Sequence, residues 1–161
     1  LVIGVFPGAV IAALKLLKEE SHYDHFSFMS CAHWPEKSGE GFQLVWQLYC
    51  RRLATWVRLE TWIPDQAPVH FPSVCAVYPA AEWHECEVYD LFGITFEKHP
   101  NLRRLFTPGM YDEFPLRRDF PLDGAPLRDF QQKLIAQWND SGQSHDHIGS
   151  LADEWMDRWN S

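Results

Sequence analysis

The chain has 161 residues, 46% of them apolar, and a formal net charge of −8. This length and apolar content can bury one sizeable core but hardly two, so we expect one folded domain. The acidic balance argues against a nucleic-acid-binding protein, because such proteins cluster basic side chains to displace counterions from phosphates.

The opening stretch, LVIGVFPGAVIAAL, is apolar, but it is too short to cross a membrane, and Pro7 and Gly8 interrupt it. It also lacks the basic start and cleavage site of a signal peptide. Pro7 suits the first turn of a helix. Apolar side chains then follow at helical spacing, at Val10, Ile11, Leu14 and Leu17. The pattern predicts a helix over residues 7–20.

Three runs of alternating apolar residues follow and predict strands. They are FSFMSCAHW at 26–34, FQLVWQLYC at 42–50 and ATWVRLETWIP at 54–64. A period of two places alternate side chains on one face of a sheet. A turn-rich segment separates the first two runs, and Arg51 and Arg52 lie in the short connection before the third. We therefore expect an antiparallel meander behind the first helix.

The stretch AAEWHECEVYDLFG at residues 80–93 predicts a second helix that ends at Gly93. Apolar groups lie all around this helix, which leaves no broad polar side for water and indicates burial. A buried carboxylate without a partner is costly, so Glu85, Glu87 and Asp90 should pair with basic side chains. The candidate partners follow along the chain, at Arg103, Arg104, Arg117 and Arg118, and we expect the pairs either within this chain or at an interface.

Two motifs, EWHECEVYDLFGITFEKHPNLRRLF at 82–106 and FPLRRDFPL at 114–122, resemble the signature of the thirty-kilodalton subunit of respiratory complex I. The same domain resembles part of energy-converting membrane hydrogenases, including formate hydrogenlyase. The likeness covers roughly residues 25–124, and the motif is long enough to be specific. It gives a candidate structural and interface motif of Glu85, Glu87, Asp90, His99, Arg103, Arg104, Arg117, Arg118 and Asp119.

Two features depart from the family pattern. Cys86 stands where the family usually places an arginine between the two glutamates, which puts one internal ion pair in question. Members from complex I usually continue after the second motif into another extended, charged segment, whereas the end of this chain is predicted to be helical. The second departure shifts weight toward the hydrogenase branch.

Residues 125–161 are predicted to form a helical extension to a domain over residues 1–124. The polar stretch NDSGQSHDH can act as a tether, and the helix after it carries an apolar stripe that includes Trp155 and Trp159. That stripe is either core or a docking helix, and we expect it to dock on a partner. The elements together predict a two-layer α+β fold, with an antiparallel or mixed sheet packed with helices and a helical C-terminal extension.

The resemblance implies a non-catalytic structural or assembly subunit in the peripheral arm of a proton-translocating NADH:quinone oxidoreductase. It would carry no cofactor, with iron–sulfur clusters, flavin, quinone or nickel–iron held by partner subunits. Its partners would be the cluster-bearing subunits and the quinone-site or hydrogenase-large-like subunit, on the cytoplasmic face of a membrane reached only through the complex. The alternative is the equivalent subunit of an energy-converting membrane-bound nickel–iron hydrogenase or formate hydrogenlyase.

The residues themselves agree with a scaffold. The chain has no glycine-rich phosphate loop, no G-x-S-x-G elbow and no H-E-x-x-H motif. Glu85 and Glu87 could form the acid and base of a hydrolase, but no pocket signature accompanies them. A stand-alone hydrolase or metal-binding enzyme is therefore a distant third reading.

The cysteines and histidines do not predict a metal site. The four cysteines have no CxxC pair, so we interpret them as reduced, buried thiols, at Cys31, Cys50, Cys75 and Cys86. The pairs Cys31 with His33 and His145 with His147 offer only two ligands each, and a metal site needs three or four that converge.

Overall fold

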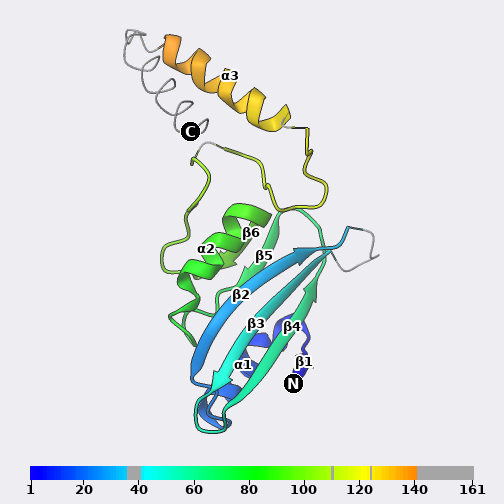
Figure 1. Ribbon diagram of the computed structural model, residues 1–161, viewed down its shortest axis with the longest axis vertical. Helices are drawn as coiled ribbons and strands as arrows, with labels where there is room; N and C mark the ends of the chain where they lie inside the picture. The colour runs from blue at the N-terminus through cyan, green and yellow to red at the C-terminus, as the bar shows by residue number, and fades with distance from the viewer. Residues whose placement is uncertain (36–40, 110, 124, 141–161) are drawn as a thin grey trace, which may run out of the picture. The chain divides into compact units, whose positions relative to one another are not determined.

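The computed structural model describes residues 1–35, 41–109, 111–123 and 125–140, which form an α+β fold (Figure 1). The chain divides into two compact units, Leu1–Phe120 and a second from Pro121 onward. The sequence-based division into a domain over residues 1–124 and a separate extension over residues 125–161 stays a prediction. The first unit contains β1 (Val2–Gly4), the 3₁₀ helix η1 (Pro7–Ala9), α1 (Val10–Glu19), β2 (His25–His33), β3 (Phe42–Cys50), β4 (Thr55–Ile63), β5 (Val69–Pro72), α2 (Ala81–Phe92) and β6 (Ile94–Glu97).

A four-stranded mixed sheet has the order β1-β4-β3-β2. The pairs β2/β3 and β3/β4 are antiparallel, which confirms the predicted meander. The edge strand β1 pairs parallel to β4. It lies within the apolar opening stretch, and its three residues are too few to show a period of two.

Alternate residues of β3 and β4 point into the core, as the sequence pattern predicts. On β3 the side chains of Phe42, Leu44, Trp46 and Leu48 are buried. Helix α1, helix α2 and the strands β5 and β6 cover this face (Figure 1). The ring of Trp46 lies 5.7 Å from that of Phe71 on β5. One apolar core therefore joins the sheet to the elements that carry the acidic motif.

The strands β5 and β6 form a separate parallel pair, and α2 connects them. Sequence analysis missed both, because each has only four residues and β5 ends in Pro72. The crossover packs α2 against β2. As a result the helix carries two of its acidic residues, Glu85 and Asp90, into the interior of the unit.

Helix α2 ends at Gly93, as predicted, because this residue adopts a left-handed conformation with φ of 77°. Its N–H donates to the carbonyl oxygen of Tyr89 at 3.0 Å. A Cβ atom at this position would lie 2.7 Å from the ring of Phe114, in the second motif. Both the backbone conformation and the close approach therefore require glycine.

We expect Gly93→Ala to lower the free energy of unfolding by about 1 to 3 kcal/mol, because alanine is strained at positive φ and the Phe114 ring has to move. Urea denaturation of the two proteins measures the difference. Gly8→Ala is the matched control, since its Cβ would meet nothing within 4 Å. Equal stabilities of Gly93→Ala and the wild type would contradict the conclusion that position 93 requires glycine.

The second unit contains α3 (Ala125–Asp140), so the predicted helical character holds for this part of the extension. The docking residues Trp155 and Trp159, and the pair His145 and His147, lie outside the described residues. Among the helices described, none combines the length and apolar character needed to cross a membrane.

Candidate structural and interface site

Helix α2 places two of its acidic side chains fully inside the unit. Glu85 and Asp90 both have no exposed surface. Each carboxylate meets a different segment of the chain, because the two residues lie on different sides of the helix. The motif therefore builds two separate buried centres.

The first centre surrounds Glu85. Its Oε1 accepts a hydrogen bond from the backbone N–H of Val74 at 2.7 Å, and its Oε2 accepts one from the thiol of Cys75 at 3.4 Å. Burial raises the pKa of Glu85, and hydrogen bonds from Ser73, Val74 and Cys75 oppose that rise. Burial also raises the pKa of the Cys75 thiol, to about 11.

Glu85 pairs with no arginine in the part of the chain that the structure describes, so the predicted pair does not form there. The histidine side chain that approaches it is His99, whose Nε2 lies 3.9 Å from Oε2 of Glu85. The turn after β5 supplies a backbone donor instead, at Val74. Such a donor leaves no signature in the sequence.

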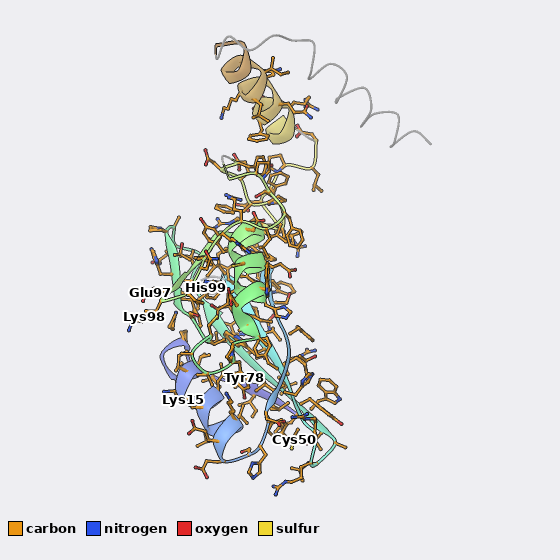
Figure 2. All side chains as sticks on the ribbon, turned by 90° about the vertical axis from the view of Figure 1, so that its left-hand side faces the viewer. Lys15, Cys50, Tyr78, Glu97, Lys98 and His99 are labelled. Atoms are coloured by element: carbon orange, nitrogen blue, oxygen red, sulfur yellow. The ribbon has the colours of Figure 1, made fainter. Side chains whose placement is uncertain are left out.

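The side chain of His99 is also fully buried, and it points toward α2, whereas Glu97 and Lys98 point away (Figure 2). Its Nδ1 accepts a hydrogen bond from the N–H of Asn101 at 3.0 Å, so the ring proton lies on Nε2 and is donated to the carbonyl oxygen of Glu82 at 3.1 Å. The neutral ring therefore ties the loop after β6 to the first turn of α2.

The thiol of Cys86 occupies the space beside this ring. Its Sγ lies 3.9 Å from Nε2 of His99 and 3.5 Å from the carbonyl oxygen of Asn101, to which the thiol donates. Cys86 is itself buried. The position that the family usually gives to an arginine thus holds an uncharged group here.

The second centre surrounds Asp90 and agrees with the predicted ion pair. Arg104 donates to Oδ1 of Asp90 at 3.0 Å. The backbone N–H groups of residues 105–107 donate to Oδ2 at 2.9, 2.7 and 3.1 Å, and the hydroxyl of Thr107 donates to Oδ1. The carboxylate therefore closes the loop after the first arginine pair into a fixed turn.

These contacts decide the ionisation of Asp90. Burial alone raises the pKa of the carboxyl group, but the hydrogen bonds from the Thr107 hydroxyl and the backbone N–H groups of residues 105–107 outweigh it and lower the pKa to about 2. Asp90 is therefore a carboxylate at neutral pH.

Glu87 corrects the prediction of a helix buried on all sides. This residue is exposed, as is Trp83 one turn before it, and no ion pair of Glu87 occurs among the described residues. Arg103 is exposed too, and its guanidinium lies 5.2 Å from the centre of the Trp83 ring. We call Trp83, Glu87 and Arg103 the exposed strip of the motif.

Arg117 fastens the second motif to the end of α2. Its Nε donates to the carbonyl oxygen of Phe92 at 2.7 Å, at the end of α2. The guanidinium lies 5.1 Å from the ring centre of Phe42 and 5.0 Å from that of Phe114. Its Nη1 is 3.8 Å from a carboxylate oxygen of Asp65. The predicted acidic partners on α2 are therefore replaced by a carbonyl group, two rings and Asp65.

The side chain of His33 joins the same region, and sequence analysis assigned it no such role. Its Nδ1 accepts a hydrogen bond from the backbone N–H of Arg118 at 3.1 Å, and its Nε2 lies 2.9 Å from Oδ2 of Asp65. Asp119 is 3.6 Å from Nδ1 but remains mostly exposed. The side chain of Arg118 is exposed. The partners lie too far apart in the sequence for a local pattern to predict them.

A second group that the sequence did not predict lies in the first centre. One ligand atom from each of Cys75, Glu85 and His99 lies within 4.8 Å of the other two. The three residues come from the turn after β5, from α2 and from the loop after β6. The pair considered earlier, Cys31 and His33, gains no third ligand of this kind among the described residues.

A cavity of about 420 Å³ opens at another place in the first unit. Its lining is mostly apolar and rich in proline, with one titratable side chain, His70. The described lining includes none of the motif residues, so the buried carboxylates do not face it. The lining consists of Pro7, Gly8, Ile63, Pro64, Gln66, Pro68, Val69, His70, Phe71 and Pro72.

Residues 3–126 match the family described as respiratory-chain NADH dehydrogenase, 30 Kd subunit. The NADH-ubiquinone oxidoreductase subunit 9 of Reclinomonas americana is 38% identical over 142 residues, which cover 85% of this chain and 68% of that protein. An NADH-quinone oxidoreductase subunit of Aquifex aeolicus is 42% identical over 113 residues, which cover 70% of this chain and 19% of that protein.

Among solved structures, a chain of the membrane-bound sulfane sulfur reductase, an archaeal respiratory membrane complex, is similar with a TM-score of 0.62. The two sequences are 26% identical, and the match covers 81% of this chain and 76% of that one. The chain spans 43% of the length of another curated relative, an NADH-quinone oxidoreductase subunit from a Nocardioides species.

Proposed function

The chain belongs to the family of the 30-kDa subunit of respiratory-chain NADH dehydrogenase, and we propose that it works as a non-catalytic structural subunit in the peripheral arm of a complex-I-like membrane redox complex. The relatives named as subunits of NADH-quinone oxidoreductases support a proton-translocating NADH:quinone oxidoreductase as that complex.

One observation carries the structural role: the acidic motif is used to hold the chain's own fold. Glu85 and Asp90 have no exposed surface, and their oxygens accept hydrogen bonds from the chain itself. The acid and base pair considered for a hydrolase, Glu85 with Glu87, would have to reach a substrate together, but Glu85 is buried away from solvent and does not line the cavity beside His70, whereas Glu87 is exposed. The motif therefore stabilises a shape that other subunits can bind.

The partners we propose are the cluster-bearing subunits and the subunit with the quinone site. Iron–sulfur clusters and flavin would belong to those partners. The chain would lie on the cytoplasmic face of the membrane as a peripheral component and reach the membrane through them. The exposed strip of Trp83, Glu87 and Arg103 would form part of the contact, because it combines an aromatic ring and an arginine, both enriched at interfaces.

Co-purification of the tagged chain from its own cells tests both the function and the contact. The wild-type chain should bring down the cluster-bearing and quinone-site subunits. Reversing two charges, in Glu87→Lys with Arg103→Glu, should remove these partners while the folded domain keeps its stability, since both side chains are exposed. Lys15→Glu, an exposed reversal on α1, is the control and should retain them.

The outcomes separate the two claims. A wild-type chain that purifies without redox subunits would refute the proposed function. A double variant that brings down the same partners as the wild type would leave the function standing and remove the exposed strip from the interface.

We also expect the isolated chain to carry no redox cofactor, because its cysteines are too dispersed for an iron–sulfur cluster. Its visible absorption spectrum should show no cluster, haem or flavin band. Stoichiometric iron with acid-labile sulfide, or bound flavin, would contradict this prediction. Apoprotein reconstituted with iron and sulfide is the control for cofactor loss during purification.

A second candidate is the equivalent subunit of an energy-converting membrane-bound nickel–iron hydrogenase. The helix α3 after the second motif favours it, as does the similarity to a chain of a respiratory complex that is named for sulfane sulfur reduction. The co-purified large subunit distinguishes the two candidates: four cysteines that hold nickel and iron indicate a hydrogenase, and a quinone cavity indicates the oxidoreductase.

A further inference from the structure

The first buried centre brings three side chains that commonly bind metal ions close together: Cys75, Glu85 and His99. The thiol of Cys75 lies 3.4 Å from Oε2 of Glu85, and Nε2 of His99 lies 3.9 Å from the same oxygen. The three ligand atoms all lie within 4.8 Å of one another. A sulfur, an oxygen and an imidazole nitrogen form a donor set typical of Zn²⁺.

We propose that Cys75, Glu85 and His99 bind a thiophilic divalent cation of the Zn²⁺ type, which fastens α2 to the segments on either side of it. This site is independent of the proposed function, because Zn²⁺ transfers no electrons. The cation would link the turn after β5 to helix α2 and the loop after β6, the two segments that carry the first motif.

The distances suit such a site. Bond lengths of about 2.0–2.3 Å place neighbouring ligand atoms of a tetrahedral zinc site about 3.3–3.8 Å apart. The contact of Cys75 with Glu85 already falls in this range, at 3.4 Å. The contact of His99 with Glu85, at 3.9 Å, has to shorten only slightly. Rotation of side chains can supply these movements.

A fourth ligand is close by. The Sγ of Cys86 lies 3.9 Å from Nε2 of His99 and approaches the ring from α2. Cys86 is not part of the three-residue group, so its sulfur has to move toward Cys75 and Glu85 before it can complete the site. With Cys75 as the only thiolate, one thiolate and one carboxylate neutralise the dication. A thiolate at Cys86 adds one negative charge to the site.

The charge and proton balance is defined. Cys75 loses its thiol proton to solvent when its sulfur binds the cation, so metal binding releases protons. Nε2 of His99 gives up its hydrogen bond to the carbonyl oxygen of Glu82, and its proton moves to Nδ1. The N–H of Asn101 then turns to water, which its exposed position allows. Cys75 is only partly buried and gives the cation a way in.

Cobalt titration of the full chain, after treatment with a chelator, tests the site. Co²⁺ replaces Zn²⁺ and gives a thiolate-to-metal charge-transfer band, which histidine-only binding does not give. We expect saturation at one Co²⁺ per chain and competition by Zn²⁺. Cys75→Ser should abolish or strongly reduce the band, and His99→Asn should weaken binding at least about ten-fold. Cys86→Ser reports whether a second thiolate binds.

Two control variants keep every ligand. Cys50→Ser changes a buried thiol at the end of β3, and His84→Asn changes a histidine on α2 that the cluster does not include. Both should bind Co²⁺ as the wild type does. Absence of the band at stoichiometric Co²⁺, or an unchanged band in Cys75→Ser, would overturn the proposal.

A measurement on the wild-type chain covers the case in which a variant does not fold. Cys75 is the most accessible of the four thiols, because the other three are buried. Zn²⁺ should slow the alkylation of Cys75 by iodoacetamide. Mass spectrometry of the peptide that contains Cys75 measures the rate. An alkylation rate that is the same with Zn²⁺ and with a chelator would also reject the site.

Discussion

Asp90→Asn should lower the free energy of unfolding by about 3 to 5 kcal/mol at neutral pH, as expected when one partner of a buried ion pair is removed. The substitution keeps the shape of the side chain and changes only its charge and one acceptor. With the amide oxygen facing the N–H groups of residues 105–107, the new NH₂ group faces Arg104 and the Thr107 hydroxyl. Two donors then meet, and Arg104 loses its counter-charge.

Urea denaturation with a spectroscopic probe measures this loss. Asp112→Asn is the matched control, because Asp112 is an exposed aspartate near the second motif, and it should stay within about 0.5 kcal/mol of the wild type. A loss for Asp90→Asn no larger than that of the control would show that the loop after the arginine pair folds without the carboxylate.

The pH dependence of the same pair gives an independent test. Burial opposes ionisation of Asp90, but the hydrogen bonds lower its pKa to about 2, below the ordinary 3.8. Its ionised form therefore contributes about 2 kcal/mol of stability above the ordinary pKa, and this is lost as the pH falls toward 2. The difference in stability between the wild type and Asp90→Asn should narrow as the pH falls from 5 toward 2. A difference that stays constant over about pH 2–5 would contradict the lowered pKa.

The sequence predicts the parts of this fold that depend on local patterns. The strand alternation of β3 and β4, the length of α2 and its end at Gly93 follow from periodicity and from the backbone freedom of glycine. The ion pair of Asp90 with Arg104 could also be predicted from the sequence, because a buried carboxylate requires donors and the arginine follows one loop later.

The remaining contacts depend on tertiary structure. Glu85 looks similar to Asp90 in the sequence, but its main donor is the backbone of Val74, which the short parallel pair β5/β6 brings under α2. The same crossover brings Cys75, which precedes the first motif, together with His99, which lies within it. Glu87 lies only two residues beyond Glu85, and the turn of the helix moves it into solvent. Residue type alone therefore did not distinguish a buried glutamate from an exposed one.

Glu85→Ala should lower the free energy of unfolding by about 2 to 4 kcal/mol, measured with a chelator present so that bound cations do not contribute. The variant leaves a cavity inside the unit, and the buried N–H of Val74 loses the acceptor that now lies 2.7 Å away. Glu85→Gln keeps an oxygen of similar position and removes the desolvated charge, so its loss should be much smaller. The larger loss expected for Glu85→Ala than for Glu85→Gln follows from hydrogen bonding and packing, and no arginine contributes to it.

Glu87→Ala provides the control on the same helix. Because Glu87 is exposed and makes no ion pair with the described part of the chain, its replacement should change the free energy of unfolding by less than about 0.5 kcal/mol. A large loss in Glu87→Ala together with a small loss in Glu85→Ala would mean that Glu87 is the buried member; the sequence alone predicted that both are buried. The structure predicts the opposite order, because Val74 and Cys75 enclose Glu85 and leave Glu87 to solvent and to the proposed partner.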